Sequence, residues 1–451
     1  MQRGRTVHLT TRRRLLRTIG LTAGIGGSLA SLPVSATRST GQVTSGSWPQ
    51  FQFDDANTGN GRLNRGPDGP AGPRLAVDAG QQIVSAPAVR NDLLYVVDNR
   101  GEVLRAIDRT NGTERWAVEA DLSGAWPAVY GDTVYLPGGN VVALDASDGT
   151  EKWEASIGGT AHGVVDNGST VVAAGSRGVT AFRSSSGSER WHFDAVSSWR
   201  EPPAVVGNDV FAVDSMGGTI VSLHIGGGNR QWLRRFDGPA PGTPTVVDNH
   251  VIVPGAGTVH AFRRSTGVTE WETHVDFETT VAAAEGLAYG VTGTELVALA
   301  VDSGTEQWRT PIPTTTNPPV IAGGTLYLAG DDGDVVAVDP TSGTIRWQSA
   351  VDAEFRSAFA VAGGELYVGT RDGTLHALAA GHGQAAETQS EEETTEAPTE
   401  APAEQDSTPA VTEEESEGAN DELLAFLGTA GLLAALVARG QKAFSGDADD
   451  E

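Results

Sequence analysis

The sequence predicts an all-β protein folded as an eight-bladed β-propeller, and three observations lead to this fold class. A short phrase, glycine-x-x-x-tryptophan, occurs seven times at spacings of 37 to 41 residues. Between the copies lie short β-type runs separated by turn dipeptides such as Asn91-Asp92, Gly207-Asn208 and Gly363-Gly364. No helical period long enough to compete occurs between residues 74 and 384. A repeat of this length, holding about four short strands, is typical of one propeller blade.

The two ends of the repeat region predict how the ring closes. The last unit, residues 358–378, has no terminal tryptophan strand, whereas an additional strand is expected at residues 74–79, before the first unit. Leu75 in that strand lies 41 residues before Trp116, which is one repeat length. Pairing residues 74–79 with residues 374–379 completes an eighth blade and removes the exposed edges of an open array. We therefore expect the propeller to cover residues 74–384.

The seven repeated tryptophans are predicted to be structural. One tryptophan at the same place in each blade suits a wedge between neighbouring blades that buries about 150–250 Å². The glycine of each phrase suits a turn that requires positive φ. The predicted docking residues are Trp116, Trp153, Trp191, Trp232, Trp271, Trp308 and Trp347.

Residues 1–36 have the pattern of a cleavable export signal. They contain six arginines and no acidic residue, followed by an apolar, glycine-rich run that ends in Val34-Ser35-Ala36. Paired arginines followed by two leucines, at residues 12–16, are typical of the twin-arginine type, which exports folded proteins. An amphipathic helix on a membrane surface is the alternative. Residues 37–73 are expected to be a lead-in segment to the ring.

The C-terminal region predicts a stalk and an anchor. Residues 385–420 consist almost wholly of Glu, Thr, Ala, Pro, Ser and Gln and are expected to be extended and disordered. Residues 421–444 contain a run of sixteen uncharged residues, about 24 Å of helix, which snorkelling of Arg439 and Lys442 would extend across a membrane. Basic residues after the run favour a cytoplasmic C-terminus, in the acidic tail at residues 445–451. A soluble helix that packs or dimerises is the alternative.

The composition excludes several kinds of site. The chain has no cysteine, so disulfides, cysteine-ligated metals and cysteine nucleophiles are impossible. Its 58 acidic and 31 basic residues give a net charge of −27, which disfavours nucleic-acid binding because phosphate would be repelled. Only two of the basic residues are lysine, and this bias resembles that of proteins from halophilic organisms. Asp331-Asp332-Gly333-Asp334 is interpreted as a hairpin turn, with a cation site as the alternative.

The repeated phrase, Ala-x-Asp-x-x-x-Gly-x-x-x-Trp, resembles the tryptophan-docking repeat of the pyrroloquinoline-quinone-type β-propellers. Trp48-Pro-Gln-Phe and Asn57-Thr-Gly also resemble the lead-in of that family. The family includes quinoprotein dehydrogenases and the scaffold lipoprotein of outer-membrane barrel assembly. For the dehydrogenases the resemblance implies adjacent cysteines, a calcium held by Glu, Asn and Asp, and a catalytic Asp. The absence of cysteine and the short repeats favour the non-catalytic scaffold branch, with no catalytic residue, cofactor or metal.

Several conspicuous residues lie outside the repeat register, in or near the connections from one blade to the next. Aromatic residues and arginines gathered on one rim are typical of protein-binding surfaces, although Trp126 and Trp199 could simply fill gaps over the ring. The candidate interaction rim comprises Trp126, Trp199, Arg200, Glu201, Phe277, Phe355, Arg356 and Arg371.

These observations together predict an exported, membrane-anchored propeller on the extracellular side of the cell membrane. It would act as a scaffold that binds an unknown protein partner or envelope polymer and no nucleic acid. The alternatives are a quinone-dependent dehydrogenase and a carbohydrate-binding or structural envelope protein.

Overall fold

The computed structural model describes residues 47–382, apart from residues 101, 121–125, 196–198 and 200. The predicted export signal, stalk, anchor and acidic tail lie outside the described residues. Within residues 47–382 as described, no helix is long and apolar enough to cross a membrane. The elements there are β-strands, beginning with the short β1 (Asn60–Gly61) and β2 (Ala71–Asp78).

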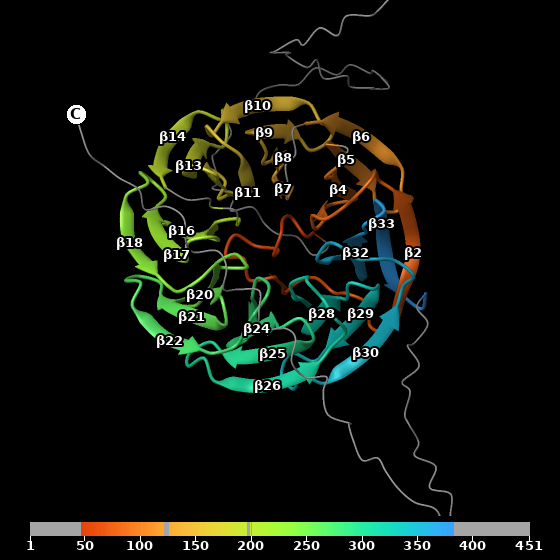
Figure 1. Cartoon of the computed structure of the whole chain (residues 1–451). Helices are drawn as coiled ribbons and strands as arrows, with labels where there is room; N and C mark the ends of the chain where they lie inside the picture. Colours follow the sequence, from red (N-terminus) through yellow and green to blue (C-terminus); the bar gives the residue numbers. More distant parts are fainter. Residues whose placement is uncertain (1–46, 101, 121–125, 196–198, 200, 383–451) are drawn as a thin grey trace, which may run out of the picture. The chain divides into compact units, whose positions relative to one another are not determined.

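Eight separate sheets are arranged around a common axis, which confirms the predicted eight-bladed ring (Figure 1). Each blade runs from a short innermost strand to an outermost strand. Blade 1 contains β3 (Ala88–Arg90), β4 (Leu93–Asp98), β5 (Val103–Asp108) and β6 (Glu114–Glu119); blade 2 contains β7 (Ala128–Tyr130), β8 (Thr133–Leu136), β9 (Asn140–Asp145) and β10 (Glu151–Ser156). Blade 3 contains β11 (Ala161–Asp166), β12 (Thr170–Gly175), β13 (Gly178–Arg183) and β14 (Glu189–Asp194); blade 4 contains β15 (Ala204–Val206), β16 (Asp209–Asp214), β17 (Thr219–His224) and β18 (Arg230–Arg235).

The second half of the chain repeats this arrangement. Blade 5 contains β19 (Thr245–Val247), β20 (His250–Gly255), β21 (Thr258–Arg263) and β22 (Thr269–Thr273); blade 6 contains β23 (Ala282–Ala284), β24 (Leu287–Val291), β25 (Glu295–Ala300) and β26 (Glu306–Pro311). Blade 7 contains β27 (Val320–Ala322), β28 (Thr325–Ala329), β29 (Asp334–Val338) and β30 (Ile345–Ala350), with β1 added at its inner edge; blade 8 contains β31 (Ala360–Ala362), β32 (Glu365–Gly369) and β33 (Thr374–Ala380).

Blade 8 is completed by the N-terminal strand, as the sequence predicts. Strand β2 pairs antiparallel with β33, in a register that runs from Ala71 opposite Ala380 to Asp78 opposite Thr374. The strand begins at Ala71 rather than at residue 74. Where the other blades carry a tryptophan, this blade presents Leu75 and Val77, whose side chains lie against Gly112 of blade 1. The first and last parts of the ring are therefore joined by one strand pair.

Six of the seven repeated tryptophans donate a hydrogen bond to the next blade. Trp191 shows the arrangement: its indole Nε1 donates a hydrogen bond to the carbonyl of Ile225, one blade further on, at 2.7 Å. The positive-φ glycine of the next phrase, Gly228, lies against the indole, and a Cβ there would come within 2.7 Å of the ring. The corresponding bonds of the other blades join Trp116 to Ala146, Trp153 to Ser184, Trp232 to Arg264, Trp271 to Val301 and Trp308 to Pro340.

Burial follows the position of each strand in its blade. Strands near the axis, such as β12 and β20, are buried at every residue because neighbouring blades cover both faces. Outermost strands such as β10 alternate, with Trp153 and Ala155 buried and the intervening Glu154 exposed. The apolar core is accordingly divided into clusters that lie between adjacent blades.

The lead-in segment does not simply precede the ring, because residues 47–65, here called the axial segment, lie at its centre (Figure 1). Their backbone bonds the innermost strands of six blades and the turn that follows β31 in another. At one end, Trp48 and Val89 exchange two backbone hydrogen bonds of 2.8 and 2.6 Å. The further pairs are Pro49 with Val129, Asp55 with Val205, Ala56 with Val246, Thr58 with Ala283, Gly59 with Ile321 and Arg65 with Gly364.

Side-chain amides reinforce this central position. Asn57 donates from Nδ2 to the carbonyls of Pro203 and Pro244, which belong to different blades. Asn64 donates from Nδ2 to Ser47 and to Val361 of β31, at 2.6 and 2.8 Å. Gln52, Phe53 and Asn57 adopt positive φ, a conformation that costs free energy and that the surrounding contacts must stabilise.

Candidate functional site

The candidate site lies on the connection face, defined here as the end of the ring that carries the segments linking one blade's outermost strand to the next blade's innermost strand. A cavity of about 240 Å³, the central cavity, opens there. Its lining comes from the axial segment and from several connections, so residues far apart in the sequence meet around it. The lining residues are Phe51, Val84, Ala86, Trp126, Glu201, Pro241, Glu278, Thr279, Thr280, Thr316, Asn317, Pro318, Arg356 and Ala358.

Two aromatic rings lie together on one side of the central cavity. Phe51 of the axial segment stacks on Trp126, which precedes β7, with ring centroids 4.9 Å apart and planes inclined by 22°. Phe51 is held in place because Trp48 and Pro49 bond the backbone of the first two blades. Its side chain is 9% exposed, whereas Trp126 is half-buried. The pair gives the cavity a flat aromatic surface at the ring axis.

The acidic wall of the cavity is positioned by the connection that leads into blade 6. Phe277 is fully buried against Gly290, where any Cβ would come within 2.2 Å of its ring. The next backbone amide, that of Glu278, donates to the carbonyl of Val291 at 2.9 Å. Glu278 itself is exposed, and among the described residues its carboxylate has no hydrogen-bond or ion-pair partner. An anchored aromatic residue thus holds a free carboxylate beside the cavity.

Two arginines at the cavity share one carboxylate, which balances only part of their charge. Arg356 donates from Nη2 to Oε2 of Glu354 at 3.2 Å, and Arg371 donates from Nη1 to the same oxygen at the same distance. The bonds from Arg371 and Arg356 lower the pKa of Glu354. The two predicted rim arginines are thus brought together on one carboxylate.

The polar groups of the wall are largely hydrogen-bonded within the protein. The hydroxyl of Thr280 accepts a hydrogen bond from the amide of Thr243 at 3.0 Å. Asn317 is 5% exposed and donates a hydrogen bond from Nδ2 to the carbonyl of Ala329. Its Oδ1 has no partner among the described residues. Thr316 bonds Oδ1 of Asp331 through both its amide and its hydroxyl.

The structure separates the predicted rim residues into two groups. Trp126, Glu201 and Arg356 line the central cavity, and Arg371 lies beside it through the shared Glu354. Trp199, Phe277 and Phe355 are 3%, 0% and 0% exposed, so their side chains do not contribute to the surface of the rim, and Trp199 agrees with the alternative in which it fills a gap over the ring. Trp199 packs in the core between blades 3 and 4, and Phe355 packs edge-on against Phe359. Arg200 lies outside the described residues.

Sequence reasoning missed the contribution of the axial segment. Phe51 was part of the phrase that resembled a family lead-in, but nothing in its spacing placed it at the ring centre. The segment also carries two half-buried carboxylates, those of Asp54 and Asp55. Burial raises the pKa of Asp54, and it raises the pKa of Asp55 to about 7 although the hydroxyl of Tyr130 donates to this carboxylate. Asp55 therefore changes charge near neutral pH, at the centre of the ring.

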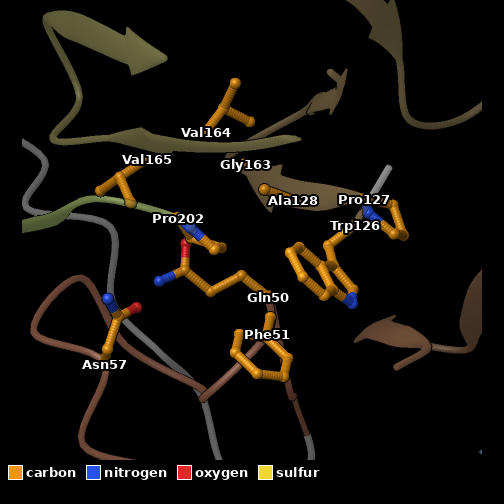
Figure 2. A pocket seen from close by; sticks show the side chains of 10 residues that line it. All are labelled: Gln50, Phe51, Asn57, Trp126, Pro127, Ala128, Gly163, Val164, Val165 and Pro202. Atoms are coloured by element: carbon orange, nitrogen blue, oxygen red, sulfur yellow. The ribbon is translucent and has the colours of Figure 1, made fainter. Parts of the chain in front are cut away.

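A second, smaller cavity of about 10 Å³ lies beside the axial segment, between blades 2 and 4 (Figure 2). Gln50, Asn57, Val164 and Pro202 are among its lining residues, and the Gln50 side chain extends toward Pro202. Nε2 of Gln50 and Oδ1 of Asn57 are buried here without a partner among the described residues. This volume is about that of a single water molecule, so the cavity is too small for an organic ligand.

The described residues do not provide a metal centre or the groups expected for a quinone cofactor. No group of three or more His, Asp and Glu side chains within them is arranged to hold a metal ion. Pyrroloquinoline quinone is a polycarboxylate, whereas the central cavity presents Glu201 and Glu278 and a single guanidinium that is already paired. The lining therefore does not fit this cofactor.

Comparisons with known proteins agree with the propeller fold. A family model described as outer membrane protein assembly factor BamB matches residues 70–175, 158–290 and 292–445. Outer membrane protein assembly factor BamB of Burkholderia pseudomallei (strain K96243) is 26% identical over 263 residues, covering 52% of this chain and 68% of that protein. The serine/threonine-protein kinase AfsK of Streptomyces griseus is 31% identical over 179 residues, but the match spans 35% of this chain and 22% of the kinase.

Solved structures share the fold at low sequence identity. BamB from Moraxella catarrhalis has a TM-score of 0.57 at 19% identity, covering 70% of this chain and 99% of that one. The quinohemoprotein alcohol dehydrogenase from Comamonas testosteroni has a TM-score of 0.63 at 15% identity, and the match covers 77% of this chain and 82% of that one. At these identities the likeness shows the propeller fold and does not discriminate between scaffold and enzyme.

Proposed function

Because the chain belongs to the family described as outer membrane protein assembly factor BamB, we propose that its propeller is a non-catalytic scaffold that binds other proteins. The observation that carries this proposal is the central cavity, which is lined both by the Phe51–Trp126 pair and by Glu278, whose carboxylate has no partner among the described residues. Aromatic surface surrounded by polar groups is what protein interfaces use for their strongest contacts.

The proposed location is the outer side of a membrane. It is supported by the export-signal pattern of residues 1–36 and by the uncharged run within residues 421–444, both of which lie outside the described residues. An acidic stalk between ring and anchor would keep the ring away from the membrane surface. In this arrangement the ring is exported already folded and meets its partner outside the cell.

A quinoprotein dehydrogenase is the second candidate, and the shared fold of the alcohol dehydrogenase structures favours considering it. The lining of the central cavity argues against it, because carboxylates would face a polycarboxylate cofactor. The chain also has no cysteine to supply the adjacent pair that the resemblance implies for that branch. The scaffold function therefore has the better support.

The scaffold proposal is tested by cross-linking the full chain in intact cells that express it, followed by mass spectrometry of the captured proteins. We expect one or a few envelope proteins to be captured repeatedly, through residues of the connection face. In parallel, purified protein is mixed with pyrroloquinoline quinone and calcium and followed with a redox dye and an alcohol. Dye reduction above the level without protein would instead identify an enzyme and contradict the proposal.

A further inference from the structure

We infer that the central cavity binds the guanidinium group of an arginine side chain on a partner protein. This inference rests on the proposed scaffold function and specifies the chemistry of its contact. It follows from three properties of the cavity, namely its charge, its flat aromatic surface and its volume, each of which points to the same kind of occupant.

The charge of the cavity calls for a cation. Glu278 has no partner among the described residues, whereas Glu201, which also lines the cavity, already interacts with another group. The guanidinium of Arg356 already donates to Glu354. Asn317 donates one hydrogen bond from Nδ2 to the carbonyl of Ala329, and its Oδ1 has no partner among the described residues and can accept a hydrogen bond. A positively charged occupant with hydrogen-bond donors would therefore complement Glu278 and the Oδ1 of Asn317.

The flat aromatic surface favours a planar cation. Phe51 and Trp126 stack with planes only 22° apart and both line the cavity. A planar guanidinium stacks on aromatic rings while its edge donates two parallel hydrogen bonds to a carboxylate such as that of Glu278. A lysine ammonium is a more strongly hydrated point charge without this planar match. The arrangement of rings and carboxylate thus favours arginine.

The volume favours a side chain over a free small molecule. The central cavity holds about 240 Å³. Sites for small molecules and cofactors usually have about 300–1,000 Å³ and enclose most of the ligand. A single long side chain that enters from above would fill the space and leave the partner's backbone on the connection face. The inferred contact is therefore one arginine anchored at the centre of a wider protein interface.

The test uses N-acetyl-arginine amide as the probe and N-acetyl-citrulline amide as its uncharged control of nearly the same shape. The full chain is labelled with 5-fluorotryptophan, and the ¹⁹F resonance of Trp126 is assigned from a Trp126→Phe variant. Titration at low salt should move the Trp126 resonance with the arginine probe and leave it unmoved with the citrulline probe. Equal shifts with both probes would overturn the inference.

Two carboxylate variants make the test specific. Glu278→Gln should weaken probe binding about tenfold, the loss expected when a charged hydrogen-bond acceptor is removed. Glu285→Gln is the matched control, because it removes the same charge from the exposed turn at the other end of β23 in the same blade. It should bind the probe as the unmodified protein does. Unchanged binding in Glu278→Gln, in a protein that retains its fluorine spectrum, would overturn the inference.

Other outcomes separate this inference from the scaffold proposal. Capture of a partner without any response to the probe would leave the scaffold function standing and overturn the guanidinium site. A probe response without any captured partner would support the site and count against the scaffold. Arg200 lies outside the described residues, so an Arg200→Gln variant is included. Binding that occurs only in that variant would show that the chain's own arginine is the occupant, which overturns a partner site.

Discussion

The ring of Phe51 lies stacked on the indole of Trp126, with centroids 4.9 Å apart, although the two residues belong to different parts of the fold. Phe51 comes from the axial segment, and Trp126 comes from the connection that enters blade 2. The contact therefore joins the centre of the ring to its connection face. It also gives the central cavity the aromatic surface on which the proposed binding depends.

Replacing Phe51 by alanine should destabilise the protein, because a nearly buried aromatic side chain loses its contacts. We expect a loss of about 3 kcal/mol in the free energy of unfolding, measured by chemical denaturation. In a double-mutant cycle with Trp126→Ala, the coupling energy should be about 1 kcal/mol. A coupling energy near zero would show that the two rings do not stabilise each other.

The half-buried carboxylate of Asp55 should make stability depend on pH. Its folded-state pKa is raised from 3.8 to about 7, so the folded protein keeps a proton that the unfolded chain releases. The resulting stabilisation is complete below about pH 4 and is lost as the pH rises through about 7. Asp55→Asn should remove most of this dependence, whereas Glu119→Gln, an exposed change on β6, should leave it. Parallel pH profiles for Asp55→Asn and the unmodified protein would contradict the assignment.

Trp191 tests the connection between neighbouring blades. Trp191→Phe keeps most of the ring but leaves the carbonyl of Ile225 without its indole donor, and should cost about 1 kcal/mol in unfolding free energy. Trp347 occupies the same position of its repeat, yet its indole makes no hydrogen bond among the described residues. Trp347→Phe should therefore cost less than Trp191→Phe. The reverse order in thermal or chemical denaturation would contradict this account of the wedge.

Ring closure can be tested with engineered cysteines, since the chain has none of its own. Leu75 and Ala377 are register partners on β2 and β33, so a Leu75→Cys/Ala377→Cys double variant should form a disulfide under mild oxidation. Its closure should raise the unfolding midpoint until the bond is reduced. The pair Leu75→Cys/Ala380→Cys is out of register and should keep both thiols open to alkylation. Equal cross-linking of the two pairs would argue against the observed register.

The ring could be predicted from the sequence because the residues that build each blade recur at a regular spacing. Trp116 and Trp153 perform the same task in successive blades, so the same residue recurs at the same distance along the chain. The missing tryptophan of blade 8 was equally informative, because Leu75 at one repeat length pointed to the closing strand. Because every blade must pack against its neighbour in the same way, the sequence repeats, and this repeat predicts the fold class.

The candidate site was only partly predictable because it does not repeat. The connections indicated a rim, and Trp126, Glu201 and Arg356 do line the cavity. Neighbouring residues in an extended segment point to opposite sides, however, so buried Phe277 and exposed Glu278 could not be told apart by position. Phe51 reaches Trp126 across a long stretch of sequence, and no local pattern indicates such a contact.

The central claim, that the connection face binds a protein at the ring axis, is tested most directly by site-specific photo-cross-linking. In one variant of the full chain, the photoreactive residue benzoylphenylalanine replaces Glu201, which lines the central cavity. In a second variant it replaces Glu285, in the exposed turn at the opposite end of β23. Both variants are expressed in the native cells. Illumination should give a discrete cross-linked protein from position 201 and none from position 285. Cross-linking from position 285 alone, or from neither position, would contradict the claim.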